Sequence, residues 1–221
     1  DILSGSYDYM APYYERVLGL QDAGDQVSFN TSTANQLTYQ GEFGTQNAAM
    51  LPMGTWFVAT LISQQASGKA NDFEWGIAPI PQSSSSTAGT DNTPVTFGDP
   101  TGFGINAGID ESKKQAAKDF LAFASSEEAA QLLAGIGITP ALLTDGVVET
   151  YFSNEGAPQD ELSRFAFAEH ETRAENPTSS KAAAIQNVLA DMHSAILSGS
   201  TSVDAAITDA QNRVANEVGL D

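Results

Sequence analysis

The sequence predicts a globular α/β or α+β fold, because amphipathic helical segments alternate along it with short apolar segments of strand character. Of its 221 residues, 41% are hydrophobic and only 17% are charged, which is the composition of a folded chain with a sizeable core. This length fits one large domain or two small ones.

The first predicted helix lies within residues 7–24, where Gly24 supplies a stop signal. Residues 27–45 are polar and weakly periodic. The apolar run at residues 47–65 is broken by Pro52 and Gly54, which predicts a short strand, a tight turn and a helix. That helix begins near Thr55, ends at Gly68, and buries Phe57, Val58 and Leu61.

Residues 73–81 (FEWGIAPIP) predict a strand whose two prolines limit pairing at its far end. The Ser-rich residues 82–93 predict a surface loop or a connection between domains. Residues 95–108 alternate apolar residues with glycines, which predicts a strand, a glycine-rich turn and a second strand.

Two helices are predicted within residues 111–137, and each has a candidate capping box. Ser112 precedes Gln115 by three residues, and Ser125 precedes Glu128 by three. Glycines 135 and 137 end the second helix. The first helix has an apolar stripe that faces away from most of its lysines and is formed by Ala116, Ala117, Phe120, Leu121 and Ala124.

A turn at ITPALL and a mixed stretch lead to Pro177, which introduces a helix over residues 181–199. A last helix follows the sequence TSVD. The first of these two helices has an apolar face of Ile185, Val188, Leu189, Met192 and Ile196, and the second buries Ile207, Ala210, Val214 and Val218.

The formal net charge of −19 disfavours partners that are themselves anionic, such as nucleic acids and acidic lipid surfaces. Cysteine is absent, which excludes a disulfide framework and a cysteine nucleophile from this chain. No apolar run reaches the roughly 18–20 residues of a membrane helix. The chain opens at Asp1 without an initiator methionine, so we expect a mature or truncated product.

Catalytic and metal-binding patterns are weak, and we expect no metal and no cofactor. The two histidines, His170 and His193, are too few and too far apart for a multi-histidine site. His170 lies in a charged stretch that forms either a solvated rim or part of a polar binding site. The 28 carboxylates contain many pairs but no specific glycosidase signature, and the GFG at 102–104 does not complete a phosphate-binding fingerprint.

Trp56 is the most informative single residue, because Pro52, Gly54 and Thr55 place its large ring where the chain changes direction. Sugars stack their C–H faces on such rings and exchange hydrogen bonds with neighbouring polar groups. The alternative is a core tryptophan that covers a helix end. Local sequence leaves both interpretations open.

Taken in order, five segments resemble the C-terminal portion of extracellular (periplasmic) solute-binding proteins of ABC sugar importers, in the maltose-binding-protein-like class. AAMLPMGTW resembles the family's A-A-M followed by G-x-W, and FEWGIAPIP resembles the next strand with its proline pair. The segment that begins GFGINAGID and ends in AQLL, the turn GITPAL and the final ILSGSTSVDAAITDAQNRV follow in the family's order.

The resemblance implies an α/β, periplasmic-binding-protein-like fold of two lobes, of which this chain holds part. Residues 1–90 and 141–221 would belong to the C-terminal lobe, and residues 91–140 would cross into the N-terminal lobe. Signal peptide, lipid-anchored cysteine and N-terminal lobe would precede Asp1, which places the protein at the extracellular face of a bacterial cell. The apolar faces of the crossing segment, with Phe120 and Leu121, would pack against another copy or the remaining lobe.

The implied function is capture of a carbohydrate in a cleft between the lobes and its delivery to membrane permease subunits, without catalysis. Two other classes stay open, an acidic glycoside hydrolase fragment and an acidic interaction module. The ligand-binding residues that we expect are Gly54, Thr55, Trp56, Asp99, Thr101, Gly102, Phe103, Arg173, Glu175 and Asn176.

Overall fold

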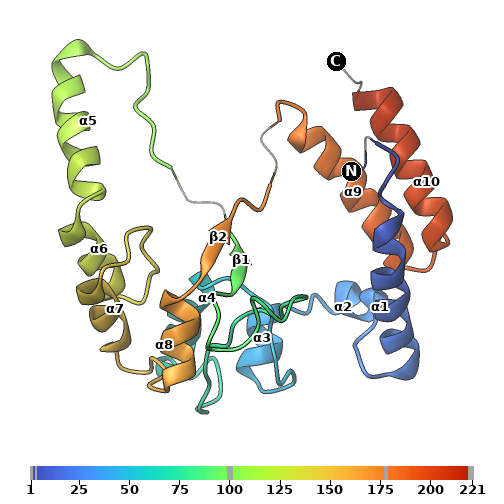
Figure 1. The fold of residues 1–221 in the computed structure, drawn as a ribbon, viewed down its shortest axis with the longest axis horizontal. Coiled ribbons are helices and arrows are strands. Elements are labelled where there is room, and N and C mark those ends of the chain that lie inside the picture. Colours follow the sequence, from blue (N-terminus) through green and yellow to red (C-terminus); the bar gives the residue numbers. More distant parts are fainter. Residues whose placement is uncertain (1, 3, 99–101, 177–178, 219–221) are drawn as a thin grey trace. The chain divides into compact units, whose positions relative to one another are not determined.

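A computed structural model describes residue 2 and residues 4–98, 102–176 and 179–218. The chain forms two compact units, one built from Asp1–Thr38 with Asn176–Asp221 and the other from Tyr39–Glu175. Figure 1 shows the helices of both units and the short strands of the second. We refer to them as unit 1 and unit 2.

Unit 1 is helical, and its helices begin and end where local signals place them. Pro12 lies in the first turn of its first long helix, and Gly24 ends that helix with a positive φ of 79°. Ser28 and Ser202 cap two further helices by accepting backbone N–H bonds. The elements are η1 (Asp8–Met10), α1 (Ala11–Ala23), α2 (Phe29–Ala34), α9 (Ala182–Leu197), α10 (Val203–Arg213) and the π-helical turn η2 (Val214–Val218).

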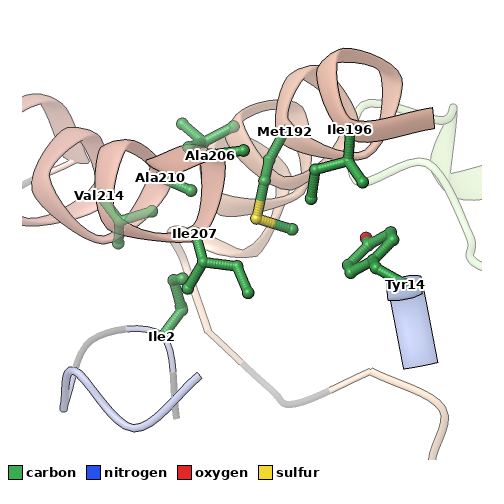
Figure 2. Close-up of a cluster of buried hydrophobic side chains, with 9 residues drawn as sticks. Ile2, Tyr14, Met192, Ile196, Ala206, Ile207, Ala210 and Val214 are labelled. Carbon is green, nitrogen blue, oxygen red and sulfur yellow. The ribbon is translucent and has the colours of Figure 1, made fainter. Parts of the chain in front are cut away.

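The core of unit 1 joins the two ends of the chain. Tyr14 of α1 meets side chains of α9 and α10, as Figure 2 shows. The apolar faces predicted for the last two helices are confirmed, because their central residues are buried and Val218 packs against the cluster. The buried members are Ile2, Tyr14, Val188, Met192, Ile196, Ala206, Ile207, Ala210 and Val214.

Unit 2 is mixed, with a small sheet among its helices. Its elements are α3 (Tyr39–Gly44), α4 (Trp56–Ala66), β1 (Val95–Phe97), α5 (Glu111–Ala124), α6 (Glu127–Ala134), α7 (Asp145–Phe152), α8 (Glu161–Ala168) and β2 (Glu171–Arg173). The two strands pair in parallel, with Val95 opposite Glu171 and Phe97 opposite Arg173. Backbone bonds from Gly98 to Arg173 and from Glu171 to Pro94 extend this pairing at both ends.

Two clusters form the core of unit 2, and α4 contributes to both. Phe57 and Leu61 pack with Ala70, as the sequence predicts for this helix. Tyr151 stacks on Phe167 with ring centroids 4.2 Å apart, and burial raises the pKa of Tyr151 to about 12. The second cluster comprises Val58, Ala130, Ala134, Val147, Tyr151, Phe152 and Phe167.

Three predicted strands are wrong within the described residues: the one before Pro52, the one at 73–81, and the one that follows the glycine-rich turn. In residues 73–81, side chains, and not a second strand, make hydrogen bonds with the backbone. Gln65 donates to the carbonyl of Phe73 at 3.0 Å, and the Ser163 hydroxyl accepts from the backbone N–H of Ile77 at 2.7 Å. Two side chains thus form the hydrogen bonds to the backbone of this segment that a neighbouring strand would otherwise provide.

Both predicted capping boxes are displaced. Asp110, not Ser112, caps α5. Its carboxylate accepts from the hydroxyl and from the backbone N–H of Ser112, and these two bonds lower the pKa of Asp110. Ser126, not Ser125, caps α6. The predicted loop at 82–93 is confirmed, whereas α2, α3, α7 and α8 are helices that sequence periodicity did not indicate.

Candidate functional site

The first turn of α4 positions the tryptophan that the sequence singles out. A Cβ atom added at Gly54 would lie 1.9 Å from Cζ3 of Trp56 and 2.3 Å from its Cε3, so the ring lies directly over the Gly54 backbone. Trp56 is 64% exposed. Its alternative role as a core tryptophan is therefore excluded, and the turn presents one face of the indole ring to solvent.

Glycine is required at position 54 for this arrangement, because any side chain would occupy the space of the indole ring. The carbonyl of Gly54 accepts from Phe57 N–H at 3.1 Å, which fixes the turn at the start of α4. Thr55 is the N-cap residue, and its side chain makes no capping hydrogen bond. Its hydroxyl is therefore not committed to the helix end.

The segment that leads into α4 adds two apolar side chains that sequence reasoning missed. Met50 is 85% exposed and Met53 is 40% exposed. The sequence predicts a short strand there, but the described chain forms no strand and keeps both methionine side chains at the surface. The signal available in the sequence was the proximity of two methionines to the proline and glycine that break the run.

A second group of candidates lies at the start of the long connection to α5. Asp99 and Thr101 lie outside the described residues. Gly102 is exposed, and Phe103 is 64% exposed with its ring 6.4 Å from that of Phe120 of α5. Phe103 is thus a surface aromatic outside any helix, and its described ring neighbour belongs to the exposed helix α5.

The third group follows β2. Arg173 is the last residue of the strand, and its Nε donates to Glu171 at 2.9 Å while both side chains stay exposed. Glu175 and Asn176 are also exposed. Asn176 belongs to unit 1, whereas the other described candidates belong to unit 2. Arg173 has a guanidinium with donors left for a polar ligand.

Among the described residues, Gly54, Thr55 and Trp56 form one continuous surface, while no hydrogen bond or ring contact joins Trp56 to Phe103 or Arg173. A shallow hollow of about 360 Å³ lies elsewhere, over residues 74–78 with Asp160 and Leu162. Its wall is a helix cap, because Ser163 donates to Asp160 at 2.7 Å and Asp160 accepts from Ser163 N–H. We therefore take the start of α4 as the candidate site.

The histidines do not form a catalytic pair with a described carboxylate. His193 Nδ1 lies 3.2 Å from the Tyr14 hydroxyl, and burial raises the pKa of that tyrosine. Across the described ranges, no three His, Asp or Glu side chains gather closely enough to hold a metal ion. In the same ranges, no helix has the length and apolar character that a bilayer crossing requires.

The chain is similar to a known protein family and to a solved structure. The model of a family described as bacterial extracellular solute-binding protein matches residues 15–151, which include the whole start of α4. A solved sugar transporter from Rhizobium etli, in an open conformation, is similar at 31% identity with a TM-score of 0.79. The match covers 97% of this chain and 53% of that one, so this chain spans about half the length of the transporter. No curated protein matches.

Proposed function

The chain belongs to the bacterial extracellular solute-binding proteins, and on that premise we propose that it is the carbohydrate-binding part of an ABC importer component. In this role it captures a sugar without making or breaking a covalent bond. The observation that carries the proposal is the exposed ring of Trp56, held over Gly54 inside the segment that matches the family. The similarity to a sugar transporter supports the choice of ligand class.

Trp56 suits a neutral polyhydroxylated ligand. Its exposed face offers an apolar surface for the C–H groups of a pyranose ring, and Thr55 adds a hydroxyl at the same turn. The net charge of −19 would repel an anionic solute, whereas it exerts no net electrostatic force on an uncharged sugar. Further contacts to the ligand would come from Gly102, Phe103, Arg173 and Glu175, and the sequence adds Asp99, Thr101 and Asn176 as candidates.

The proposed function also implies a protein partner and a cellular location. A solute-binding component delivers its ligand to permease subunits, so it works on the extracellular side of the membrane, either periplasmic or lipid-anchored. Residues 91–140 would belong to the N-terminal lobe and residues 1–90 and 141–221 to the C-terminal lobe. The compact units have other boundaries, at 38/39 and 175/176.

A glycan-binding screen followed by calorimetry tests the function. We expect Trp56→Ala to weaken the binding of the sugar that the wild-type chain selects by about tenfold, and Trp56→Phe to keep part of the affinity. Trp75→Phe is the matched control, because Trp75 is half-buried and its Nε1 donates to Gln65 within the fold. If Trp56→Ala binds the sugar with the affinity of the wild type, Trp56 is not part of the binding site.

The glycoside hydrolase alternative makes a different prediction. Incubation with the selected oligosaccharide, followed by chromatography, yields only intact ligand if the chain is a binding protein. Shorter products that accumulate in proportion to protein concentration would establish the hydrolase instead.

A further inference from the structure

A large excess of negative charge has to be accommodated when this chain folds. The chain has 28 Asp and Glu residues against 9 Lys and Arg residues, and its net charge is −19. Even if every basic side chain paired with one carboxylate, 19 carboxylates would have no cationic partner within the chain. Such an excess opposes the compact state, because folding brings like charges closer together than they are in the unfolded chain.

The carboxylates lie at the surface, where ions from solution reach them. Every Asp and Glu among the described residues is exposed except Glu42, which is half-buried. They are not gathered at one place, because no three described His, Asp or Glu side chains come close enough together to hold a metal ion. The negative charge is therefore spread over the surface, and dissolved ions screen it without occupying a fixed site.

The ion pairs of the described residues do little to offset this charge. Arg213 lies between two carboxylates, with its Nη2 3.0 Å from Asp191 and its Nε 3.2 Å from Glu217. Arg173 contacts Glu171 in the same way along β2. The carboxylates of these pairs are exposed, and exposed ion pairs contribute little to the free energy of unfolding.

We propose that the folded state of this chain depends on salt, and that dissolved cations, not basic side chains, screen most of its carboxylates. The protein is then suited to surroundings of high ionic strength. Exposed charges act on one another over about 10 Å in 0.1 M salt and over about 3 Å in 1 M salt. Repulsion among the carboxylates therefore decreases over this range, which stabilises the compact state relative to the unfolded chain.

The candidate ligand site lies in a part of the chain without this charge. Residues 43–68, which include Gly54, Thr55 and Trp56, contain no charged side chain. We therefore expect salt to act on folding and not on the binding of an uncharged sugar at that turn. The salt dependence does not rest on the proposed function, since it follows from the charge of the chain whatever the ligand is.

Urea unfolding in about 0.01 M and about 1 M KCl tests the proposal, because urea is uncharged and leaves the ionic strength unchanged. We expect the unfolding midpoint, followed by circular dichroism, to rise by at least about 1 M urea in the higher salt. NaCl should act as KCl does, because screening depends on ionic strength and not on a fitted ion site. An unchanged or lower midpoint in the higher salt overturns the proposal.

Two charge variants separate screening from a general effect of salt on hydrophobic burial. The first replaces four exposed carboxylates, two in each compact unit, by amides: Asp22→Asn, Asp72→Asn, Glu155→Gln and Asp209→Asn. It should have a higher midpoint than the wild type in low salt and gain less from high salt. Lys69→Gln combined with Lys118→Gln removes two exposed cations and should have the opposite effects. If both variants respond to salt as the wild type does, the proposal is refuted.

Discussion

Gly54→Ala is the sharpest test of the candidate site, because one added methyl group would displace the indole ring that Gly54 supports. The added Cβ would lie 1.9 Å from Cζ3 of Trp56. Carbon atoms in contact are separated by roughly 3.5–4.0 Å, so the ring must move by about 1.5–2 Å or rotate away. Trp56 is 64% exposed, and the ring therefore moves into solvent and not into the core.

The cost of this movement should appear in binding and not in stability. We expect Gly54→Ala to lose about 1–2 kcal/mol of ligand-binding free energy, which is roughly a five- to thirtyfold loss of affinity. The free energy of unfolding should change by less than about 1 kcal/mol, because few core contacts are involved. Calorimetric titration with the selected sugar and urea unfolding measure the two quantities.

Gly104→Ala is the matched control, because a Cβ at that glycine meets no atom within 4 Å. A readout without ligand is acrylamide quenching of Trp56 fluorescence in the Trp75→Phe background, where Gly54→Ala should change the accessibility of the ring. If Gly54→Ala binds sugar as the wild type does and quenches identically, the placement of the ring over Gly54 is refuted.

Ser163→Ala should destabilise the protein by about 1–3 kcal/mol, because the fully buried hydroxyl accepts from Ile77 N–H and donates to Asp160. Thermal unfolding measures this, and Ser194→Ala on the exposed side of α9 should have no comparable effect. Hydrogen bonds from Ser163 lower the pKa of Asp160, so its contribution is present above the ordinary carboxyl pKa and is lost on acidification below about pH 4. The stability difference between wild type and Asp160→Asn should therefore shrink between about pH 5 and pH 3, and a constant difference would contradict this assignment.

The helices that sequence alone located are those whose stop signals and apolar faces agree. Gly24 and Gly199 follow α1 and α9 with positive φ values of 79° and 75°, as their positions after periodic segments predict. The short helices α7 and α8 were not predicted, because a helix of eight residues has too few turns for an apolar periodicity to be recognised in the sequence. Their N-caps, Thr144 and Asp160, were the local signals available.

Strands were harder to predict because a strand exists only where another segment pairs with it. The apolar alternation at 73–81 is compatible with a ladder, but Ser163 and Gln65 satisfy that backbone instead. β1 is paired with a segment far along the chain, and nothing local to Val95 identifies Glu171 as its partner. At the site, the sequence located the turn at Gly54 and Thr55, but only the structure shows the ring folded over the glycine.

The discontinuity of unit 1 constrains the order in which the chain folds during synthesis. Tyr14 is translated before unit 2, whereas Ile196 and Val214, which complete its core, are translated after it. Unit 2 is complete in the nascent chain before α9 exists. The first helix α1 therefore lacks most of its core until α9 and α10 have been translated. During that interval, the apolar side chains of α1 that later enter the core of unit 1 remain in contact with water.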